Sequence, residues 1–96
     1  MNKRRLITSG GVARRLMLRG HVCIDVCPQR QDKSKSCFVF YKDRWLSADI
    51  DEIMQSPEKR DIPVIEKRLN EAGMTMQEYR RAIFEEYLSG SDGVGA

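Results

Sequence analysis

The 96-residue sequence lacks long apolar runs, and it contains only three cysteines, three prolines and one histidine. No apolar stretch approaches the roughly 18 residues that span a bilayer, so we expect no transmembrane helix. The opening residues, MNKRRLITSGG, lack the apolar segment and cleavage site of a secretory signal. An odd number of cysteines argues against a disulfide-stapled secreted scaffold. We therefore expect a small protein of a reducing, cytoplasmic compartment, with no membrane partner.

Residues that could bind a metal ion are few. His21, Cys23, Cys27 and Cys37 form a zinc-ligand set by composition alone. On a regular strand, His21 and Cys27 would lie roughly 20 Å apart, whereas zinc ligands lie about 2.3 Å from the metal. Only Cys27 and Cys37 can approach each other across a hairpin, where a disulfide is sterically possible. We expect no metal ion and no cofactor, and the cysteines are predicted to act as small hydrophobic residues.

Motifs for catalysis and for nucleotide binding are also scarce. His21, Cys23 and Asp25 would share one face of a strand, but such neighbours are about 6.6 Å apart, beyond direct hydrogen-bond reach. The Thr8–Gly11 turn precedes a predicted helix, yet it matches no glycine-rich phosphate-binding pattern. Ser9 in this turn is better explained as a helix N-cap. We predict no catalytic residues and a non-enzymatic protein.

The order of the periodic patterns predicts an α+β fold. Residues 4–7 are typical of a short strand, and the apolar spacing that follows predicts a helix that begins after Ser9 and ends just before Gly20. Alternating residues over 22–26 and 37–41 predict an antiparallel hairpin with a long basic loop. Because a lone hairpin is marginal in water, the first strand should join it. We expect a small three-stranded, mainly antiparallel sheet in β-α-β-β order, covered by helices.

The register of the hairpin can be predicted from parity. If the even-numbered apolar residues of both strands face one core, paired positions must have an even index sum. The simplest pairing places Cys27 opposite Cys37, Asp25 opposite Val39, and Cys23 opposite Tyr41.

Helical spacing dominates the C-terminal half. A short helix is predicted around residues 45–54, followed by a helix pair at about 63–72 and 76–88. Gly73 and the capping box from Thr75 to Glu78 separate the two members of the pair.

These elements predict a single α+β domain over residues 1–88 and a disordered tail over 89–96. The sheet and first helices should occupy 1–56, and the helix pair 62–88. Four apolar residues of the pair share one face and could form a homodimer or partner surface: Leu69, Met76, Tyr79 and Ile83.

Charge is divided unevenly along the chain. Residues 1–35 contain nine basic and two acidic residues, whereas residues 36–96 contain eight basic and twelve acidic ones. This asymmetry predicts an anionic partner for the first third of the chain. Arg14, Arg15 and Arg19 on one helix should form the centre of a basic face, flanked by Arg4, Arg5, Arg30, Lys33 and Lys35.

Several core and cap positions carry a family resemblance over residues 6 to about 54. They are Ile7-Thr8-Ser9, Ala13, Leu16, Gly20-His21, Cys37-Phe38-Val39-Phe40 and Asp49-Ile50. With these residues the chain resembles a family of small uncharacterised proteins of phages and other bacterial mobile elements. The resemblance implies an accessory protein that meets DNA or a host nucleoprotein machine.

Four functions are considered from the sequence. The first is a binding protein whose basic N-terminal face engages nucleic acid or a nucleoprotein complex. The second is a protein–protein inhibitor or adaptor, such as an anti-CRISPR-like anti-defence protein that blocks a host nuclease. The third is a dimeric structural module that uses the C-terminal helices. The last in rank is a redox or metal role.

Overall fold

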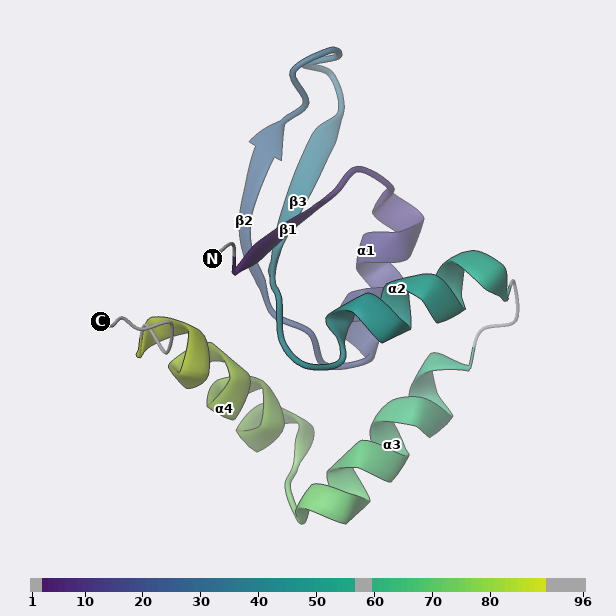
Figure 1. Ribbon diagram of the computed structural model, residues 1–96, viewed down its shortest axis with the longest axis vertical. Helices are drawn as coiled ribbons and strands as arrows, with labels where there is room; N and C mark the ends of the chain where they lie inside the picture. Colours follow the sequence, from purple (N-terminus) through teal and green to yellow (C-terminus); the bar gives the residue numbers. More distant parts are fainter. Residues whose placement is uncertain (1–2, 57–59, 90–96) are drawn as a thin grey trace.

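The computed structural model describes residues 3–56 and 60–89, and these form a three-stranded antiparallel sheet with four helices (Figure 1). The strands are β1 (Arg4–Ile7), β2 (Cys23–Pro28) and β3 (Ser36–Tyr41). The helices are α1 (Gly10–Leu18), α2 (Leu46–Gln55), α3 (Asp61–Ala72) and α4 (Met76–Leu88). The predicted α+β fold and its C-terminal helix pair are confirmed.

The central strand of the sheet is β3, which pairs antiparallel with β1 on one side and β2 on the other. Cys27 lies opposite Cys37 and Asp25 opposite Val39, as the parity argument predicts. Cys23 instead lies opposite Phe40, because a β-bulge between Cys23 and Asp25 shifts the register. The predicted Cys23–Tyr41 pair is therefore wrong, and Cys23 lies on the opposite face of the sheet from Cys27.

One face of the sheet, the inner face, carries the main hydrophobic core. Ile7 and Phe40 of the sheet pack there against Ala13 and Leu16 of α1, together with three apolar residues of α2: Leu46, Ile50 and Ile53. The Ser9 hydroxyl accepts a hydrogen bond from the Val12 amide at 3.3 Å and caps α1, as predicted. The β2–β3 hairpin projects beyond the helices that cover this core (Figure 1).

The other, outer face of the sheet is covered at one end by α4. The rings of Tyr41 in β3 and Tyr87 in α4 lie 5.5 Å apart, and Arg4 of β1 donates a hydrogen bond to the Tyr87 hydroxyl at 3.1 Å. Toward the hairpin loop this face is open, and Leu6 is 61% exposed there.

The helix pair agrees closely with its predicted bounds. Gly73 ends α3 with a left-handed φ of 66°, and Thr75 and Glu78 form the capping box that starts α4. The two helices make a V beside the sheet (Figure 1). Residues 90–96 of the predicted tail lie outside the described residues, and no described helix has the length and apolar character that a bilayer crossing requires.

Part of the predicted dimer surface on the helix pair faces the rest of the chain. Ile83 is buried, and Leu69, Met76 and Tyr79 are half-buried. The Tyr79 ring packs so closely on Gly20 that a Cβ built there would lie 2.9 Å from it. This contact of Tyr79 helps to hold the helix pair against the domain, and a homodimer through the surface stays a prediction.

Candidate functional site: a buried charge network beneath an aromatic cleft

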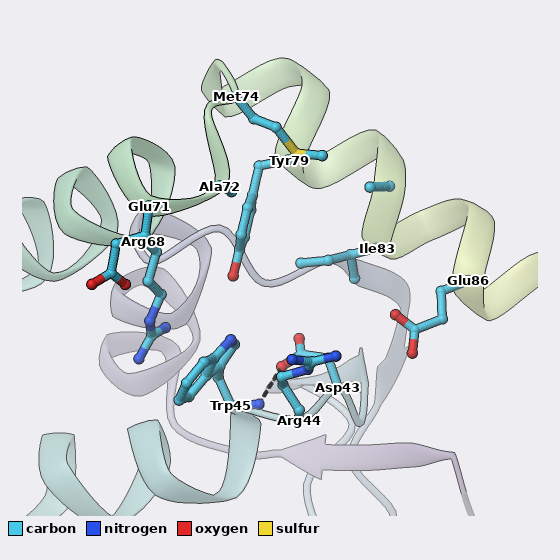
Figure 2. Close-up of a pocket in the computed structure, with 11 residues that line it drawn as sticks. Asp43, Arg44, Trp45, Arg68, Glu71, Ala72, Met74, Tyr79, Ile83 and Glu86 are labelled. Carbon is cyan, nitrogen blue, oxygen red and sulfur yellow. Dashed lines mark hydrogen bonds between the residues drawn. The ribbon is translucent and has the colours of Figure 1, made fainter.

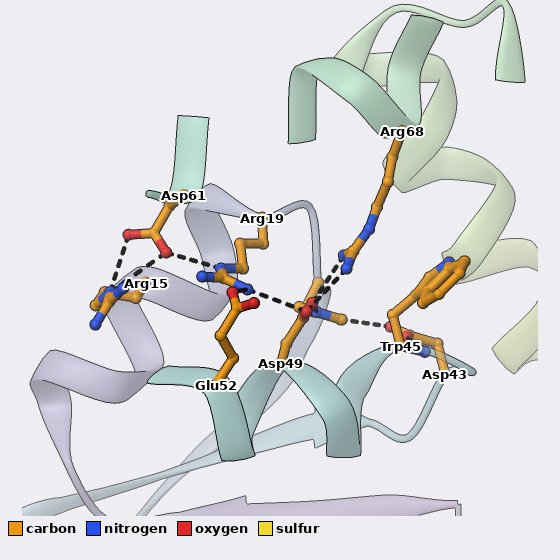
Figure 3. A network of polar contacts seen from close by, with 9 residues as sticks. Arg15, Arg19, Asp43, Trp45, Asp49, Glu52, Asp61 and Arg68 are labelled. Carbon is orange, nitrogen blue, oxygen red and sulfur yellow. Dashed lines mark hydrogen bonds and ion pairs between the residues drawn. The ribbon is translucent and has the colours of Figure 1, made fainter. Parts of the chain in front are cut away.

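The turn that ends α1 places the Arg19 side chain inside the protein. Arg19 is 1% exposed, and its Nε donates to Asp61 Oδ1 at 2.7 Å. Its Nη1 lies 3.1 Å from Asp49 Oδ1 and 2.6 Å from Glu52 Oε1 (Figure 3). Burial alone would lower the pKa of Arg19, but the three carboxylates outweigh it and raise the pKa. Arg19 is therefore a fixed internal cation.

Asp61, at the start of α3, joins Arg19 to a second arginine of α1. Arg15 Nε donates to both carboxylate oxygens of Asp61, at 3.3 and 3.0 Å, and Arg15 Nη1 donates to the Ser56 carbonyl at 3.2 Å. Burial would raise the pKa of Asp61, but hydrogen bonds and charge from both arginines lower it. The helix dipole favours a carboxylate at this position too.

His21 lies between two carboxylates. Its Nδ1 is 2.7 Å from Asp43 Oδ2, and its Nε2 is 2.5 Å from Asp49 Oδ2. An ionised carboxylate only accepts hydrogen bonds, so both ring nitrogens must donate and the ring is an imidazolium. Burial alone would lower the pKa of His21, but hydrogen bonds and charge from both aspartates raise it.

Asp49 of α2 is the centre of the network. Besides Arg19 and His21, its carboxylate accepts two hydrogen bonds from Arg68 of α3, at 2.7 and 2.8 Å. Burial opposes ionisation, but Arg68 and His21 hold the pKa of Asp49 well below its usual range. The Arg68 guanidinium also lies 4.7 Å from the centre of the Trp45 ring, in a cation–π contact.

The network is electrically balanced and fully bonded. With His21 protonated, four cations (Arg15, Arg19, His21 and Arg68) face four carboxylates (Asp43, Asp49, Glu52 and Asp61). In the described part of the chain, no buried side-chain nitrogen or oxygen lacks a hydrogen-bond partner. Because these residues come from α1, α2, α3 and two connecting turns, the network ties the helices together.

The network corrects the predicted basic face. Arg15 and Arg19 were expected at its exposed centre, but acidic residues from the later half of the chain neutralise both of them. The remaining predicted residues are exposed: Arg4, Arg5, Arg14, Arg30, Lys33 and Lys35. Three of these six residues lie on the hairpin loop, whereas α1 contributes one, Arg14.

The sequence carries a signal for this burial. Arg19 follows Leu16 by three positions, Asp49 lies between Leu46 and Ile53, and Asp61 precedes Ile65 by four. At these spacings each charged residue falls in the apolar stripe of its own helix. One charge in the stripe of each of three helices predicts an internal network, which an argument from net charge alone overlooks.

The three residues considered for catalysis, His21, Cys23 and Asp25, do not lie together in the structure. His21 is 1% exposed inside the network, Cys23 packs against the core, and Asp25 is exposed on the outer face. Across residues 3–56 and 60–89, no group of three His, Cys, Asp or Glu side chains is arranged to hold a metal ion.

A cleft of about 370 Å³ lies above the network, between the helix pair and the loop that leads into α2 (Figure 2). Its apolar lining comes from Trp45, Met74, Tyr79 and Ile83, with the charged side chains of Arg44, Arg68, Glu71 and Glu86 around them. Trp45 is 42% exposed, and burial raises the pKa of Tyr79. The cleft can accept an apolar or aromatic group with polar edges.

No protein-family model, curated protein or solved structure matches this chain.

Proposed function

We propose that the chain is a non-enzymatic binding protein that contacts nucleic-acid phosphates through the basic loop of the β2–β3 hairpin. The charge left outside the network carries the proposal. Once the network residues are set aside, residues 1–44 retain nine basic residues against Asp25 and Asp32, whereas residues 45–96 have five basic and eight acidic ones. The sheet half of the molecule therefore presents positive charge, which attracts a polyanion.

The hairpin loop concentrates part of this charge at a projecting position. Arg30, Lys33 and Lys35 are all exposed in it, and the Asp32 carboxylate is engaged locally by the amide and hydroxyl of Ser34. A two-stranded ribbon fits the major groove of DNA, which is about 12 Å wide. Contacts to phosphates from such a loop would be salt-sensitive and tolerant of sequence.

The base of the loop is anchored beside the start of α1. The Gln29 side chain donates to the Thr8 carbonyl at 3.4 Å and to the Ser36 carbonyl at 3.1 Å. The first turn of α1 contains no acidic residue, so its positive dipole end adds to the charge of the loop. Loop and helix end thus favour an anion at the same end of the sheet.

The test is a fluorescence-anisotropy titration of duplex and single-stranded DNA at several salt concentrations. The triple variant Arg30→Gln, Lys33→Gln, Lys35→Gln should bind more weakly. The plot of log affinity against log salt should also become less steep, its negative slope shrinking in magnitude by up to about three. The matched control removes three exposed cations from the helix pair: Lys67→Gln, Arg80→Gln, Arg81→Gln.

Both triple variants have the same formal charge, so net charge cannot explain a difference between them. Wild-type-like binding by the control supports the hairpin as the contact. Equal losses in both variants, or no salt-dependent DNA binding by the wild type, would contradict the proposal.

The cleft favours a second candidate, a protein–protein inhibitor or adaptor. Trp45, Tyr79 and Arg44 line it, and Trp, Tyr and Arg are the residue types that dominate binding energy at protein interfaces. A partner complex purified from host lysate should then be lost with Arg44→Glu, an exposed residue, and be retained by the hairpin variant. A complex that is retained by Arg44→Glu and lost with the hairpin variant would instead indicate that the partner binds the hairpin loop.

A further inference from the structure

Two thiols lie opposite each other on the outer face of the sheet. Cys27 of β2 pairs with Cys37 of β3. Two positions further along, the Gln29 amide donates to the Lys35 carbonyl at 3.0 Å, which places positions 29 and 35 at a hydrogen-bonded pair position of the ladder. Since such pairs recur every second residue, Cys27 and Cys37 form one as well, with Cα atoms about 5.5 Å apart. This separation falls within the range of about 4.4–6.8 Å that a disulfide spans.

The β-bulge keeps the third thiol away from this pair. All three cysteines are free, but the register shift turns Cys23 to the inner face, where it lies opposite Phe40 and packs against the core. Cys27 and Cys37 therefore have each other as partners without competition from Cys23.

The two thiols open onto a hollow of about 410 Å³ on the uncovered part of the outer face. Leu6 and Pro28 give it apolar walls, and the side chain of Arg30 lines one edge. The volume is that of a small-molecule site. The Arg30 cation suits a ligand that carries carboxylates.

The thiols differ in access. Cys27 is half-buried and Cys37 is buried. Burial and the neighbouring Cys27 raise the pKa of Cys37, which keeps it a thiol at neutral pH. The accessible Cys27 is therefore suited to attack a molecule in the hollow, and Cys37 is suited to react second.

We propose that Cys27 and Cys37 form a thiol–disulfide exchange site for a small anionic disulfide of the glutathione class. Cys27 loses its proton to solvent and attacks one sulfur of the disulfide, which forms a mixed disulfide and releases one small thiolate. Cys37 then loses its proton and attacks the Cys27 sulfur, which expels the second small thiolate. Overall, two protein thiols are oxidised to one disulfide and one small disulfide is reduced to two thiols. This proposal does not rest on the proposed nucleic-acid function, and the two sites share Arg30.

The experiment treats the full reduced chain with glutathione disulfide at neutral pH, alkylates the remaining thiols and maps the peptides by mass spectrometry. The wild type should gain a Cys27–Cys37 cross-link while Cys23 remains alkylated. Cys37→Ser should stop at a mixed disulfide on Cys27, and Cys27→Ser should lose most of the reaction. Cys23→Ser is the matched control, and it should form the cross-link at the wild-type rate.

The same reaction in denaturant separates the fold from the sequence. Unfolded chain should modify all three cysteines without preference, because the hollow and the strand pairing are gone. Modification of Cys23 as fast as Cys27 in the folded wild type would overturn the proposal. So would a wild-type product that remains a mixed disulfide, or a rate unaffected by Cys27→Ser.

Discussion

The Asp49 carboxylate is the shared counter-charge of three cationic side chains: Arg19, His21 and Arg68. Removing charges from water costs free energy, which a buried ion pair recovers only through close geometry and complete hydrogen bonding. The network meets both conditions. Its contribution is therefore lost most severely when a single member is removed and its partners stay buried without a counter-charge.

Asp49→Asn tests this at the centre of the network. The substitution keeps the size of the side chain but leaves three cations without their shared counter-charge. We expect the free energy of unfolding to fall by about 3–5 kcal/mol in urea denaturation. Asp51→Asn, at an exposed position of the same helix, should change it by less than about 0.5 kcal/mol. Equal effects of the two variants would show that the network does not stabilise the fold.

The His21 imidazolium makes stability depend on pH. Its pKa in the folded chain is raised above the ordinary 6.5, so its contribution is complete below that value and is lost as pH rises through the folded pKa. The pKa values of Asp49 and Asp61 are lowered from 3.8, so their contributions are present above that value and are lost as pH falls through the folded pKa values. Stability should therefore be greatest between about pH 4 and 6.5.

The measurement is the urea midpoint across the pH range from 3 to 8. His21→Gln should lose the decline on the neutral side and keep the decline on the acidic side. A wild-type midpoint that rises steadily from pH 5 to 8 would contradict a charged histidine.

Among the helices and strands, the features that depend only on residues close in sequence can be predicted from the sequence. The caps at Ser9, Thr75 and Glu78 and the turn at Gly73 act within one helical turn, so their sequence pattern is sufficient. The bulge in β2 was not predictable, because it is a shift in the pairing of β2 with β3 and no local sequence motif marks it. It accounts for the wrong partner of Cys23.

The charge network was missed for a related reason. Arg19 meets Asp49 and Asp61 across 30 and 42 positions of sequence, and Arg15 meets Asp61 across 46. The number of charges in each segment predicts that Arg15 and Arg19 are exposed, because such a count contains no information about which helices pack together. The periodicity of each helix did contain it, at Arg19, Asp49 and Asp61.

Substitution of Gly20 tests how tightly the end of α1 packs against the helix pair. Its φ is 91°, and an added Cβ would lie 2.9 Å from the Tyr79 ring and 3.0 Å from Ile65 Cδ1. Gly73 has a φ of 66° with open space around it. Gly20→Ala and Gly73→Ala therefore share the backbone strain, and crowding should add about 1–3 kcal/mol of destabilisation to the first. Equal losses in thermal or urea unfolding would exclude a tight contact at Gly20.

On the scale of the whole molecule, the helix pair is held by few buried side chains. Only Asp61 and Ile65 are buried in α3, and only Ile83 in α4, among the residues that the structure describes. Attachment thus depends heavily on polar contacts, which places the pair at the low-stability end of the structure.

Hydrogen exchange should reveal this difference. The amides of α3 and α4 should exchange through a local opening that leaves β3 protected, and Asp61→Asn should make that opening easier while β3 changes less. Glu66→Gln, exposed on α3, is the control and should leave both regions unchanged. Simultaneous exchange of β3 and the helix pair in the Asp61 variant would indicate one cooperative unit instead.

The joint occupation of Asp49 by three cations also constrains how this fold can diverge. A lineage that replaced any one of the four groups would carry uncompensated charge inside the protein until the others changed as well. We therefore expect intermediate sequences to be less stable, and the four residues to be kept or replaced together. Exposed cations such as those of the hairpin loop face no such barrier and are free to adapt one at a time to a new partner.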